Sequence, residues 1–304
     1  MLLYVLESSG SSPGRQGFFM AVNAKEEMEG SVGGGMMEHK FVEMAKKELQ
    51  AVSLELPAFS IRKQIHDKSV AKDQSGMICS GEQTIWLYPV QNKDQQAIDA
   101  LVDSLEKNRN GKLMLSPKGI QFDLNVPSKN FEFDYKSETD WVYREKTGYK
   151  NQLTIIGGGH CALAFSKLMS EMDFYIRVYD DREHLKTMDG NEFVHEKYVI
   201  SNYEELKQKI QPGDDHYVVI MTFGYRTDDV ALRALIDKEF KYLGLLGSKS
   251  KVEKMFDDYR KEGVNEKLLQ RVHTPIGLAI RSQTPAEIAV SIAAEIIKVK
   301  NQDL

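Results

Sequence analysis

The chain of 304 residues contains a glycine-rich segment whose spacing is typical of phosphate binding. An apolar run ends at Ile156 and is followed by the pattern G-x-G-x-x-A at Gly157, Gly159 and Ala162. In such a loop, glycines permit a tight turn and a close approach to a diphosphate, and free N–H groups at the helix start donate to its oxygens. We therefore predict a nucleotide-binding loop that also includes His160. The alternative is a tight turn with a structural role alone.

A carboxylate and a guanidinium follow the next predicted strand. Asp180 comes 23 residues after Gly157, where an acid can accept a hydrogen bond from a ribose hydroxyl. Arg182 could instead bind a phosphate on the same ribose. The sequence therefore leaves open whether the loop binds a plain or a 2′-phosphorylated ribose.

A second glycine-containing turn follows the last predicted strand of the same region, at residues 244–249. The backbone of Gly247 and Ser248 and the ammonium group of Lys249 could hold an anion there. Ser248 could equally be an ordinary helix N-cap. Because open α/β sheets bind ligands at the carboxyl ends of their strands, we expect Thr222, which ends the preceding strand, to border the same site.

Two loops of small residues in the first part of the chain could also approach a phosphate. One covers residues 8–15 and ends at Arg15, which can pair with a phosphate. The other precedes a predicted helix, in which Glu38 could orient a polar ring or only favour the helix dipole. The glycines of this loop could bring backbone N–H groups close to a ligand. They are Gly33, Gly34 and Gly35.

The chain has two cysteines, too few for a disulfide framework and without the spacing of a structural zinc site. This favours a reducing compartment. Cys79 lies among small residues at 75–81 that would expose its thiol, and the residues alone favour a reactive role and a packing role equally. Cys161 follows His160 at a predicted helix start, where we expect it to pack on the neighbouring strand.

The second half of the chain alternates short apolar runs with helical segments, which predicts a doubly wound parallel sheet. We assign this Rossmann-like α/β domain to residues 148–304. Its last segment opens with a capping box from Thr284 to Glu287 and continues with an apolar stripe, which predicts a helix packed on the sheet. The predicted strands cover residues 153–156, 174–179, 198–200, 217–222 and 242–246, and the other predicted helices cover 160–172, 203–210, 228–237 and 248–262.

The first half of the chain predicts a mixed α+β domain over residues 1–147. Its polar end, residues 144–150, is predicted to be the linker between the domains. The predicted strands cover residues 2–6, 18–22 and 84–90, and the predicted helices cover 37–49 and 94–107.

Composition restricts the class of protein. Hydrophobic residues make up 41% of the chain and charged residues 28%, which excludes a disordered or fibrous protein. The net charge of -5 provides no basic field for nucleic acid, so we expect no such partner. No apolar run approaches the length of a signal-peptide core or a membrane span, and we therefore expect a cytoplasmic protein without membrane contact.

These motifs occur together, and in this order, in a known family: the chain resembles the XdhC/CoxI family over nearly its whole length. Members of this family are xanthine dehydrogenase accessory proteins that act in the maturation and insertion of the molybdenum cofactor. The resemblance rests on the residue types at 10–15, 30–38, 76–81, 156–162, 244–249, 275–278 and 284–290.

The resemblance implies a cofactor chaperone, not a turnover enzyme. It would bind the molybdenum cofactor, in which molybdopterin carries the metal, in a crevice between the two domains. It would hold this cofactor while a cysteine desulfurase exchanges an oxo ligand for a sulfido ligand. It would then pass the cofactor to a xanthine dehydrogenase-type apoenzyme. Family members are often homodimers.

The resemblance also implies roles for the candidate residues. The phosphate or dinucleotide tail of the cofactor suits the glycine and arginine clusters, while a soft thiolate suits molybdenum and sulfur chemistry. Cys79 would then be the functional thiol and would contact molybdenum through the cofactor.

Three positions depart from the family pattern. Ser80 stands where many relatives have the first glycine of Cys-Gly-Gly, and Gly35 or Met36 stands where many have a second cysteine. Phe223 stands where a histidine commonly follows Met-Thr. A two-thiol mechanism in the first domain and a role for that histidine are therefore not carried over to this chain.

Two other functions remain open. A nicotinamide-dependent oxidoreductase would use the same Gly157 loop and Asp180 to bind NAD(P), although the sequence offers no recognisable general acid or base beyond scattered candidates such as His160 and His273. A dinucleotide sensor would keep the loop, use the first domain to dock a protein, and leave Cys79 as a packing residue.

Overall fold

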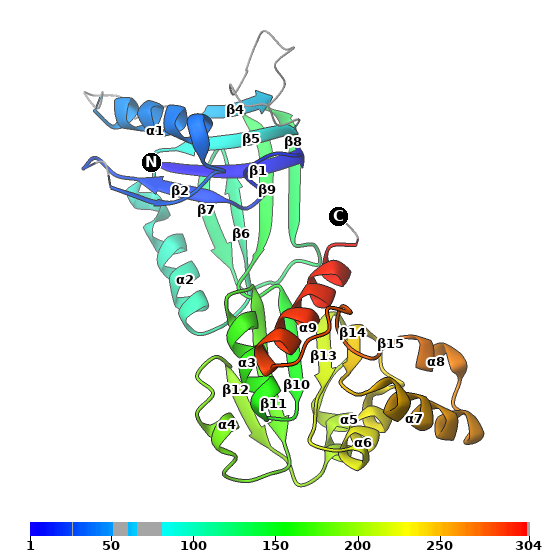
Figure 1. Ribbon diagram of the computed structural model, residues 1–304. Helices are drawn as coiled ribbons and strands as arrows, with labels where there is room; N and C mark the ends of the chain where they lie inside the picture. Colours follow the sequence, from blue (N-terminus) through cyan, green and yellow to red (C-terminus); the bar gives the residue numbers. More distant parts are fainter. Residues whose placement is uncertain (26, 51–59, 66–80, 303–304) are drawn as a thin grey trace. The chain divides into compact units, whose positions relative to one another are not determined.

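The computed structural model describes residues 1–25, 27–50, 60–65 and 81–302 (Figure 1). The chain divides into two compact units, Met1–Gly148 and Tyr149–Leu304. Cys79, the predicted functional thiol, lies outside the described residues. Within them, no helix has both the length and the apolar character that crossing a bilayer requires.

The first unit is built on a five-stranded antiparallel sheet with the order β3-β2-β1-β5-β4. A single helix, α1 (Gly35–Gln50), packs its buried residues Met37, Phe41 and Ala45 on one face of this sheet, where they meet Leu3 and other strand residues. The strands are β1 (Leu2–Gly10), β2 (Phe19–Val22), β3 (Met28–Gly30), β4 (Ser60–Ile65) and β5 (Gly81–Tyr88).

A four-stranded antiparallel sheet with the order β7-β6-β9-β8 covers the other face of the five-stranded sheet. Aromatic rings fill the contact: Trp86 and Trp141 meet edge to face with ring centroids 5.4 Å apart. The elements are the 3₁₀ helix Asn92–Asp94, α2 (Gln95–Glu106), β6 (Gly111–Ser116), β7 (Gly119–Asp123), β8 (Phe131–Ser137) and β9 (Asp140–Thr147).

The division between the two units falls between Gly148 and Tyr149, within the predicted linker of residues 144–150, but the first four residues of that segment lie in a strand. The sequence pattern did not reveal the four-stranded sheet. Residues 144–147 belong to β9. They are polar because the strand alternates: Arg144 pairs with Glu132 and Asp134 of β8 at 3.1 and 2.7 Å, while its neighbour Tyr143 is buried. A strand with one partly exposed face of ion-paired side chains therefore resembles a linker in composition.

The second unit contains a six-stranded parallel sheet with the order β12-β11-β10-β13-β14-β15. In chain order this is 3-2-1-4-5-6, the arrangement of dinucleotide-binding domains, and it confirms the predicted doubly wound fold. The strands are β10 (Asn151–Ile156), β11 (Phe174–Asp180), β12 (Glu196–Val199), β13 (Gly213–Ile220), β14 (Phe240–Leu245) and β15 (Val272–His273).

Helices cover both faces of the parallel sheet (Figure 1). On one face lie α3 (His160–Ser170), α4 (Lys186–Asp189) and α9 (Pro285–Lys300). On the other face lie the 3₁₀ helix Tyr203–Glu205, α5 (Leu206–Lys209), α6 (Tyr225–Leu235), α7 (Lys249–Lys261) and α8 (Glu266–Gln270). Both faces of the central strands are therefore removed from water, which explains why these strands read as continuous apolar runs.

The start of α9 carries the predicted capping box. The Thr284 hydroxyl accepts from the Glu287 N–H at 3.2 Å, and the Glu287 carboxylate accepts from the Thr284 N–H at 3.2 Å. Beyond the cap, Ile292 and Ile296 are fully buried against the sheet. The cap and the apolar stripe together fix where the helix begins and which face it buries.

We expect Thr284→Ala to lower the free energy of unfolding by about 1 kcal/mol, because the Glu287 N–H loses its acceptor. Chemical denaturation followed by far-ultraviolet circular dichroism measures this change. Thr284→Ser keeps the hydroxyl and should unfold close to the wild type. If the alanine variant has the same midpoint as the wild type, packing alone holds the first turn of α9.

Candidate functional site

The candidate site lies where the strand order of the parallel sheet reverses. β10 pairs with β11 on one side and with β13 on the other, so the loops after β10 and β13 leave the sheet beside each other. Open α/β sheets bind ligands at this switch point, outside the carboxyl ends of the strands. The glycine loop follows β10 at residues 157–159, and Thr222 follows β13.

The first two glycines of the loop are required by packing. Gly157 has a φ of +106°, and a Cβ there would collide with the backbone carbonyl of Met221. A Cβ on Gly158 would lie 2.9 Å from the Cβ of Met188, and the Gly158 carbonyl accepts from the Thr187 hydroxyl at 2.6 Å. Both positions are therefore closed in by the protein itself.

The third glycine has space around it. Gly159 is the N-cap of α3 and supplies no side-chain cap, and a Cβ built on it would have nothing within 4 Å. His160 beside it is exposed, whereas Ala162 is 1% exposed and lets the helix approach the sheet. The loop therefore presents the backbone of a helix N-terminus to open space, the arrangement by which such loops receive a phosphate.

The Asp180 carboxylate is fully buried beneath this loop. It accepts from the Gly158 N–H at 2.7 Å, from the Arg182 N–H at 2.9 Å, and from Nε and Nη2 of the Arg182 guanidinium, each at 2.8 Å. Burial by itself would raise the pKa of Asp180, but these hydrogen bonds outweigh it and the pKa is lowered. A ribose hydroxyl would have to displace Arg182 to reach this carboxylate.

Arg182 is the group of this pair that faces outward. Its side chain is 36% exposed, against none for Asp180. Its guanidinium carbon lies 5.2 Å from the ring centroid of Phe223, a residue of the loop after β13. The structure thus brings together Gly159, Asp180 and Arg182 with Phe223, a residue that the sequence marks only as a departure from the family pattern.

A second buried carboxylate holds the loop after β13. Asp228, which is fully buried, accepts from the Thr222 N–H at 3.0 Å and from the Thr222 hydroxyl at 2.6 Å. Its other oxygen pairs with the ammonium group of Lys251 on α7. Thr222 was predicted from the sequence, whereas Asp228 and Lys251 were missed, because a contact between two helices 23 residues apart leaves no local pattern.

The turn after β14 has the geometry of an ordinary helix cap. The Ser248 hydroxyl accepts from the Lys251 N–H at 3.4 Å, so Ser248 is the N-cap of α7. The Lys249 side chain is 83% exposed, and its ammonium group lies 3.8 Å from Glu253. A Cβ on Gly247 would make only ordinary contacts with α7. An anion-binding role for Gly247, Ser248 and Lys249 stays a prediction.

The two candidate loops of the first unit lie against each other. The Gln83 side chain, which is 1% exposed, donates to the carbonyl of Gly14 at 2.9 Å and to that of Val32 at 3.1 Å. A Cβ on Gly33 would come within 2.5 Å of the Gly14 nitrogen. Gln83 was not predicted as a site residue, and nothing in its local sequence indicates that it joins these loops.

Glu38 organises the glycine loop of the first unit. Its carboxylate accepts from the Ser31 hydroxyl at 2.6 Å, from the Val32 N–H at 3.0 Å and from the Gly34 N–H at 2.9 Å. Burial opposes these contacts, but they outweigh it and lower the pKa of Glu38. The loop glycines Gly33, Gly34 and Gly35 all have positive φ, at 127°, 74° and 69°.

Arg15 stands at the end of the neighbouring loop and is exposed. Its Nη1 donates to the Gly10 carbonyl at 3.1 Å. The first unit therefore brings Arg15, the three loop glycines and Glu38 to one region through Gln83.

Cys161 is the cysteine that the structure describes. It lies in the first turn of α3, partly buried against the core, and burial raises the pKa of its thiol, which keeps it protonated. Among the described residues, no group of three His, Cys, Asp or Glu side chains could hold a metal ion.

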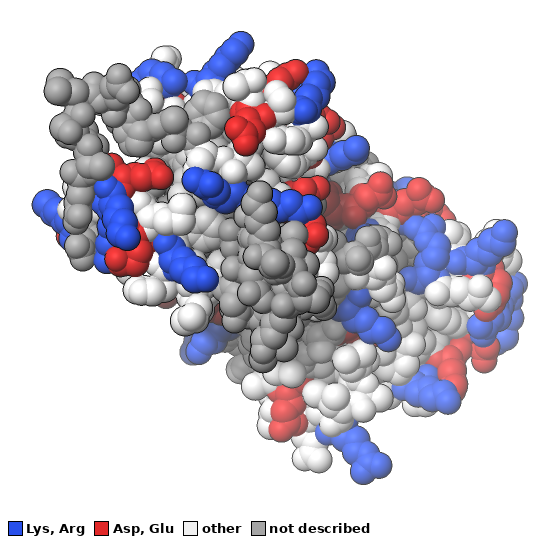
Figure 2. Space-filling model, turned by 90° about the horizontal axis from the view of Figure 1, so that it is seen from above, with Lys and Arg blue, Asp and Glu red and all other residues white. Residues whose placement is uncertain are grey.

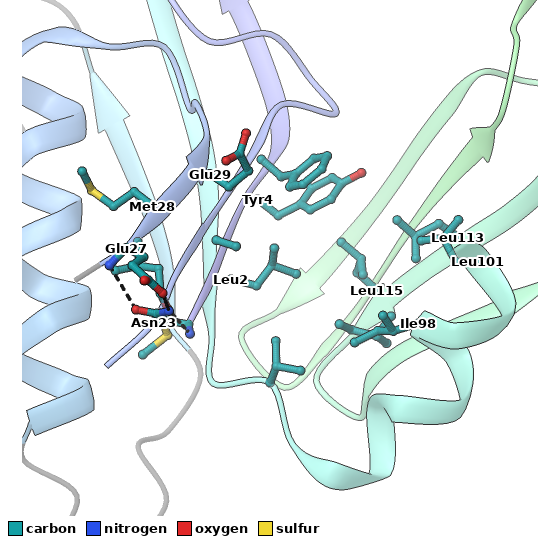
Figure 3. A pocket seen from close by; sticks show the side chains of 16 residues that line it. Leu2, Tyr4, Asn23, Glu27, Met28, Glu29, Ile98, Leu101, Leu113 and Leu115 are labelled. Atoms are coloured by element: carbon teal, nitrogen blue, oxygen red, sulfur yellow. Dashed lines mark hydrogen bonds between the residues drawn. The ribbon is translucent and has the colours of Figure 1, made fainter. Parts of the chain in front are cut away.

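The first unit also contains an apolar cavity of about 490 Å³ that the sequence did not indicate (Figure 3). Leu2, Ile98 and Leu115 line its interior, and Glu27 and Asn23, joined by a hydrogen bond of 2.5 Å, stand at one side. Tyr4 lies at the wall, where its hydroxyl donates to the buried Glu145. The cavity lacks the glycine-rich backbone of the phosphate-type loops.

The charged side chains show no large patch of one sign on the face seen in Figure 2, where Lys and Arg lie among Asp and Glu. This agrees with the small net charge of the chain, -5.

Comparisons with known proteins identify relatives of both units. A family model described as the XdhC Rossmann domain matches residues 153–296, and a model described as the XdhC and CoxI family matches residues 1–54. A crystal structure of a xanthine dehydrogenase from Bacillus halodurans has a TM-score of 0.72 and 24% identity, and the match covers 100% of this chain and 92% of that one. This likeness shows that the two chains share a fold.

Two curated proteins are also similar. The chain is 26% identical over 301 residues to the uncharacterized protein YqeB of Escherichia coli strain K12, covering 98% of this chain and 43% of that protein. It is 24% identical over 166 residues to a probable xanthine dehydrogenase subunit of Bacillus subtilis strain 168, covering 54% of this chain and 48% of that protein. The chain thus spans about half the length of the curated relatives it matches.

The two family models fall one in each unit, and they include the glycine loop of each. The Rossmann-domain model begins within β10 and ends within α9, so it covers nearly all of the parallel sheet together with the loops after β10 and β13. On this agreement between sequence, fold and family models, the chain belongs to the XdhC and CoxI family.

Proposed function

We propose that the chain is a maturation factor for a xanthine dehydrogenase-type molybdoenzyme. It binds the molybdenum cofactor as its substrate, holds it while a cysteine desulfurase supplies the sulfido ligand, and transfers it to the apoenzyme. The observation that carries this proposal is family membership through both units, since each model includes one of the two glycine loops. The same proposal includes that the protein is cytoplasmic, that it forms a homodimer, and that it interacts with the cysteine desulfurase and the apoenzyme.

The Gly159 loop of the second unit suits the phosphate end of the cofactor. The backbone around Gly159 faces open space at a helix N-terminus, and no side chain of the loop competes for its N–H groups. Such a terminus stabilises a phosphate through N–H donors and the helix dipole. We assign the phosphate or dinucleotide tail of the cofactor, or a separate NAD(P), to this loop.

The first unit offers a second place for a polar ligand. Arg15 supplies a guanidinium, and the loop glycines supply backbone that Glu38 holds in position. Gly81, the first residue described after Cys79, lies against Ser12 of the Arg15 loop. In the proposed mechanism these loops orient the molybdopterin, and the Cys79 thiolate, a soft ligand, contacts the molybdenum that the pterin carries.

A nicotinamide-dependent oxidoreductase is the alternative. It would require a general acid or base near the switch point. The carboxylates found there, Asp180 and Asp228, are fully buried and ion-paired with Arg182 and Lys251. Such pairs hold loops in place and are poorly suited to exchanging protons with a substrate, so an oxidoreductase would have to rely on the exposed His160 beside Gly159.

We expect the purified protein to retain molybdenum cofactor through gel filtration and Cys79→Ser to retain several-fold less, because an oxygen replaces the soft ligand. Molybdenum content and the fluorescence of the oxidised pterin in the protein peak measure retention. Cys161→Ser is the matched control and should retain as much as the wild type, since the Cys161 side chain packs against the core from within α3.

The outcomes separate the three functions. Full retention and full apoenzyme activation by Cys79→Ser would remove this thiol from the mechanism and favour the dinucleotide sensor. If the wild type retains no pterin but changes the absorbance of a nicotinamide cofactor in a substrate-dependent way, the chain is an oxidoreductase.

We also expect Gly159→Asp to weaken binding of ADP by more than about tenfold, because the new carboxylate would cap the N–H groups and repel a phosphate. The fold should remain intact, since a side chain at this position meets open space and aspartate is a favourable N-cap. Isothermal titration calorimetry measures the affinity, and Gly159→Ala, which adds a Cβ without charge, is the control. Equal ADP affinity in all three proteins would show that the loop is a structural turn.

A further inference from the structure

We propose that Phe223, with Arg182 beside it, forms a base-stacking subsite, in which a purine or pyrimidine ring lies on the Phe223 ring while its phosphates lie at Gly159. This inference rests on the proposed binding of a nucleotide by the Gly159 loop and names the part of the ligand that the loop itself does not contact. Neither the family models nor the relatives assign such a role to this position.

The exposure of Phe223 is the first observation. At 69%, it is the most exposed of the large hydrophobic side chains in the part of the chain that the structure describes. A single exposed ring is ordinary on a protein surface, so its exposure counts here only because the ring stands beside Arg182 at the carboxyl edge of the sheet. Aromatic rings that stack on nucleotide bases are left exposed in this way until the ligand arrives.

The ring is held in place and does not stand on a free loop tip. Thr222, the residue before it, is fixed by two hydrogen bonds to the buried Asp228, whose other oxygen pairs with Lys251. Two residues before it, the Met221 carbonyl packs against Gly157. The backbone that carries Phe223 is therefore attached to both the glycine loop and α6.

Arg182 closes one face of the ring and connects it to the phosphate loop. Its guanidinium lies over Phe223, while its Nη2 and the Gly158 N–H donate to the same oxygen of Asp180. Two donors on one oxygen, at 2.8 and 2.7 Å, must lie within about 5.5 Å of each other. One buried carboxylate thus places the stacking pair next to the backbone that receives the phosphates.

The chemistry of the pair indicates the class of ligand. A guanidinium and a phenyl ring both offer flat surfaces to a π system, and neither reads the hydrogen-bonding edge of a base. Stacking of this type tolerates different bases, because each has a π face. We therefore infer that the subsite takes nucleoside diphosphate groups with little preference among adenine, guanine and cytosine.

The test compares ligands with and without a base. Isothermal titration calorimetry would measure ADP, GDP and CDP, with inorganic pyrophosphate as the ligand that lacks a ring. We expect Phe223→Ala to weaken the three nucleotides by about five- to 100-fold and to leave pyrophosphate unchanged. Phe223→Trp should bind the nucleotides at least as tightly as the wild type, and Phe223→Leu, which keeps apolar volume without a ring, should resemble the alanine variant.

The controls distinguish this inference from the proposed function. Phe18→Ala removes another exposed phenyl ring, in the first unit, and should change none of the affinities. If the wild type binds nucleotides and Phe223→Ala binds them equally well, stacking is disproved while the phosphate loop stands. If the wild type binds neither nucleotides nor pyrophosphate, the phosphate loop fails and the subsite fails with it. A loss of pyrophosphate binding in Phe223→Ala would mean that the substitution disturbs the loop, and it would also overturn the stacking assignment.

Discussion

The buried carboxylate of Asp180 is the interaction on which the candidate site depends. A charge without access to water is stable only when donors surround it, and here they come from the glycine loop and from Arg182. These donors fix the turn after β10 and the orientation of the guanidinium at once. Asp180, which the motif assigns to a ribose hydroxyl, thus holds the glycine loop and Arg182 in position. A ligand would contact Arg182 and not Asp180.

Asp228 repeats this arrangement on the other side of the switch point. It holds the backbone of Thr222 on one oxygen and Lys251 on the other, as Asp180 holds Gly158 and Arg182. Both carboxylates are fully buried, and both join a loop at the carboxyl edge of the sheet to a cation from a neighbouring segment. The edge is therefore rigid on two sides, as a site that receives a cofactor without large rearrangement requires.

The sequence predicted those features that depend on neighbours in the chain. The strand, G-x-G-x-x-A and helix around Gly157 form a local pattern, and so does the capping box at Thr284. The Asp228–Lys251 pair and the contact of Gln83 with two loops arise from tertiary packing and leave no signal in spacing. The end of β9 resembles a linker because its alternating Arg144 and Tyr143 combine a paired polar face with a buried one. The residue types of seven segments together indicated the family, but only the three-dimensional structure could show that Phe223 lies beside Arg182.

The three glycines of the Gly159 loop differ in what constrains them, and this affects how the loop can evolve. Side chains at Gly157 and Gly158 would collide with Met221 and Met188, so folding alone selects against them. A side chain at Gly159 would meet no protein atom within 4 Å, so packing does not require glycine there. A lineage that lost its ligand would accumulate substitutions at the third position while the first two stayed fixed. If the loop binds a phosphate as proposed, a side chain at position 159 with glycine kept at 157 and 158 would mark a relative that no longer does so.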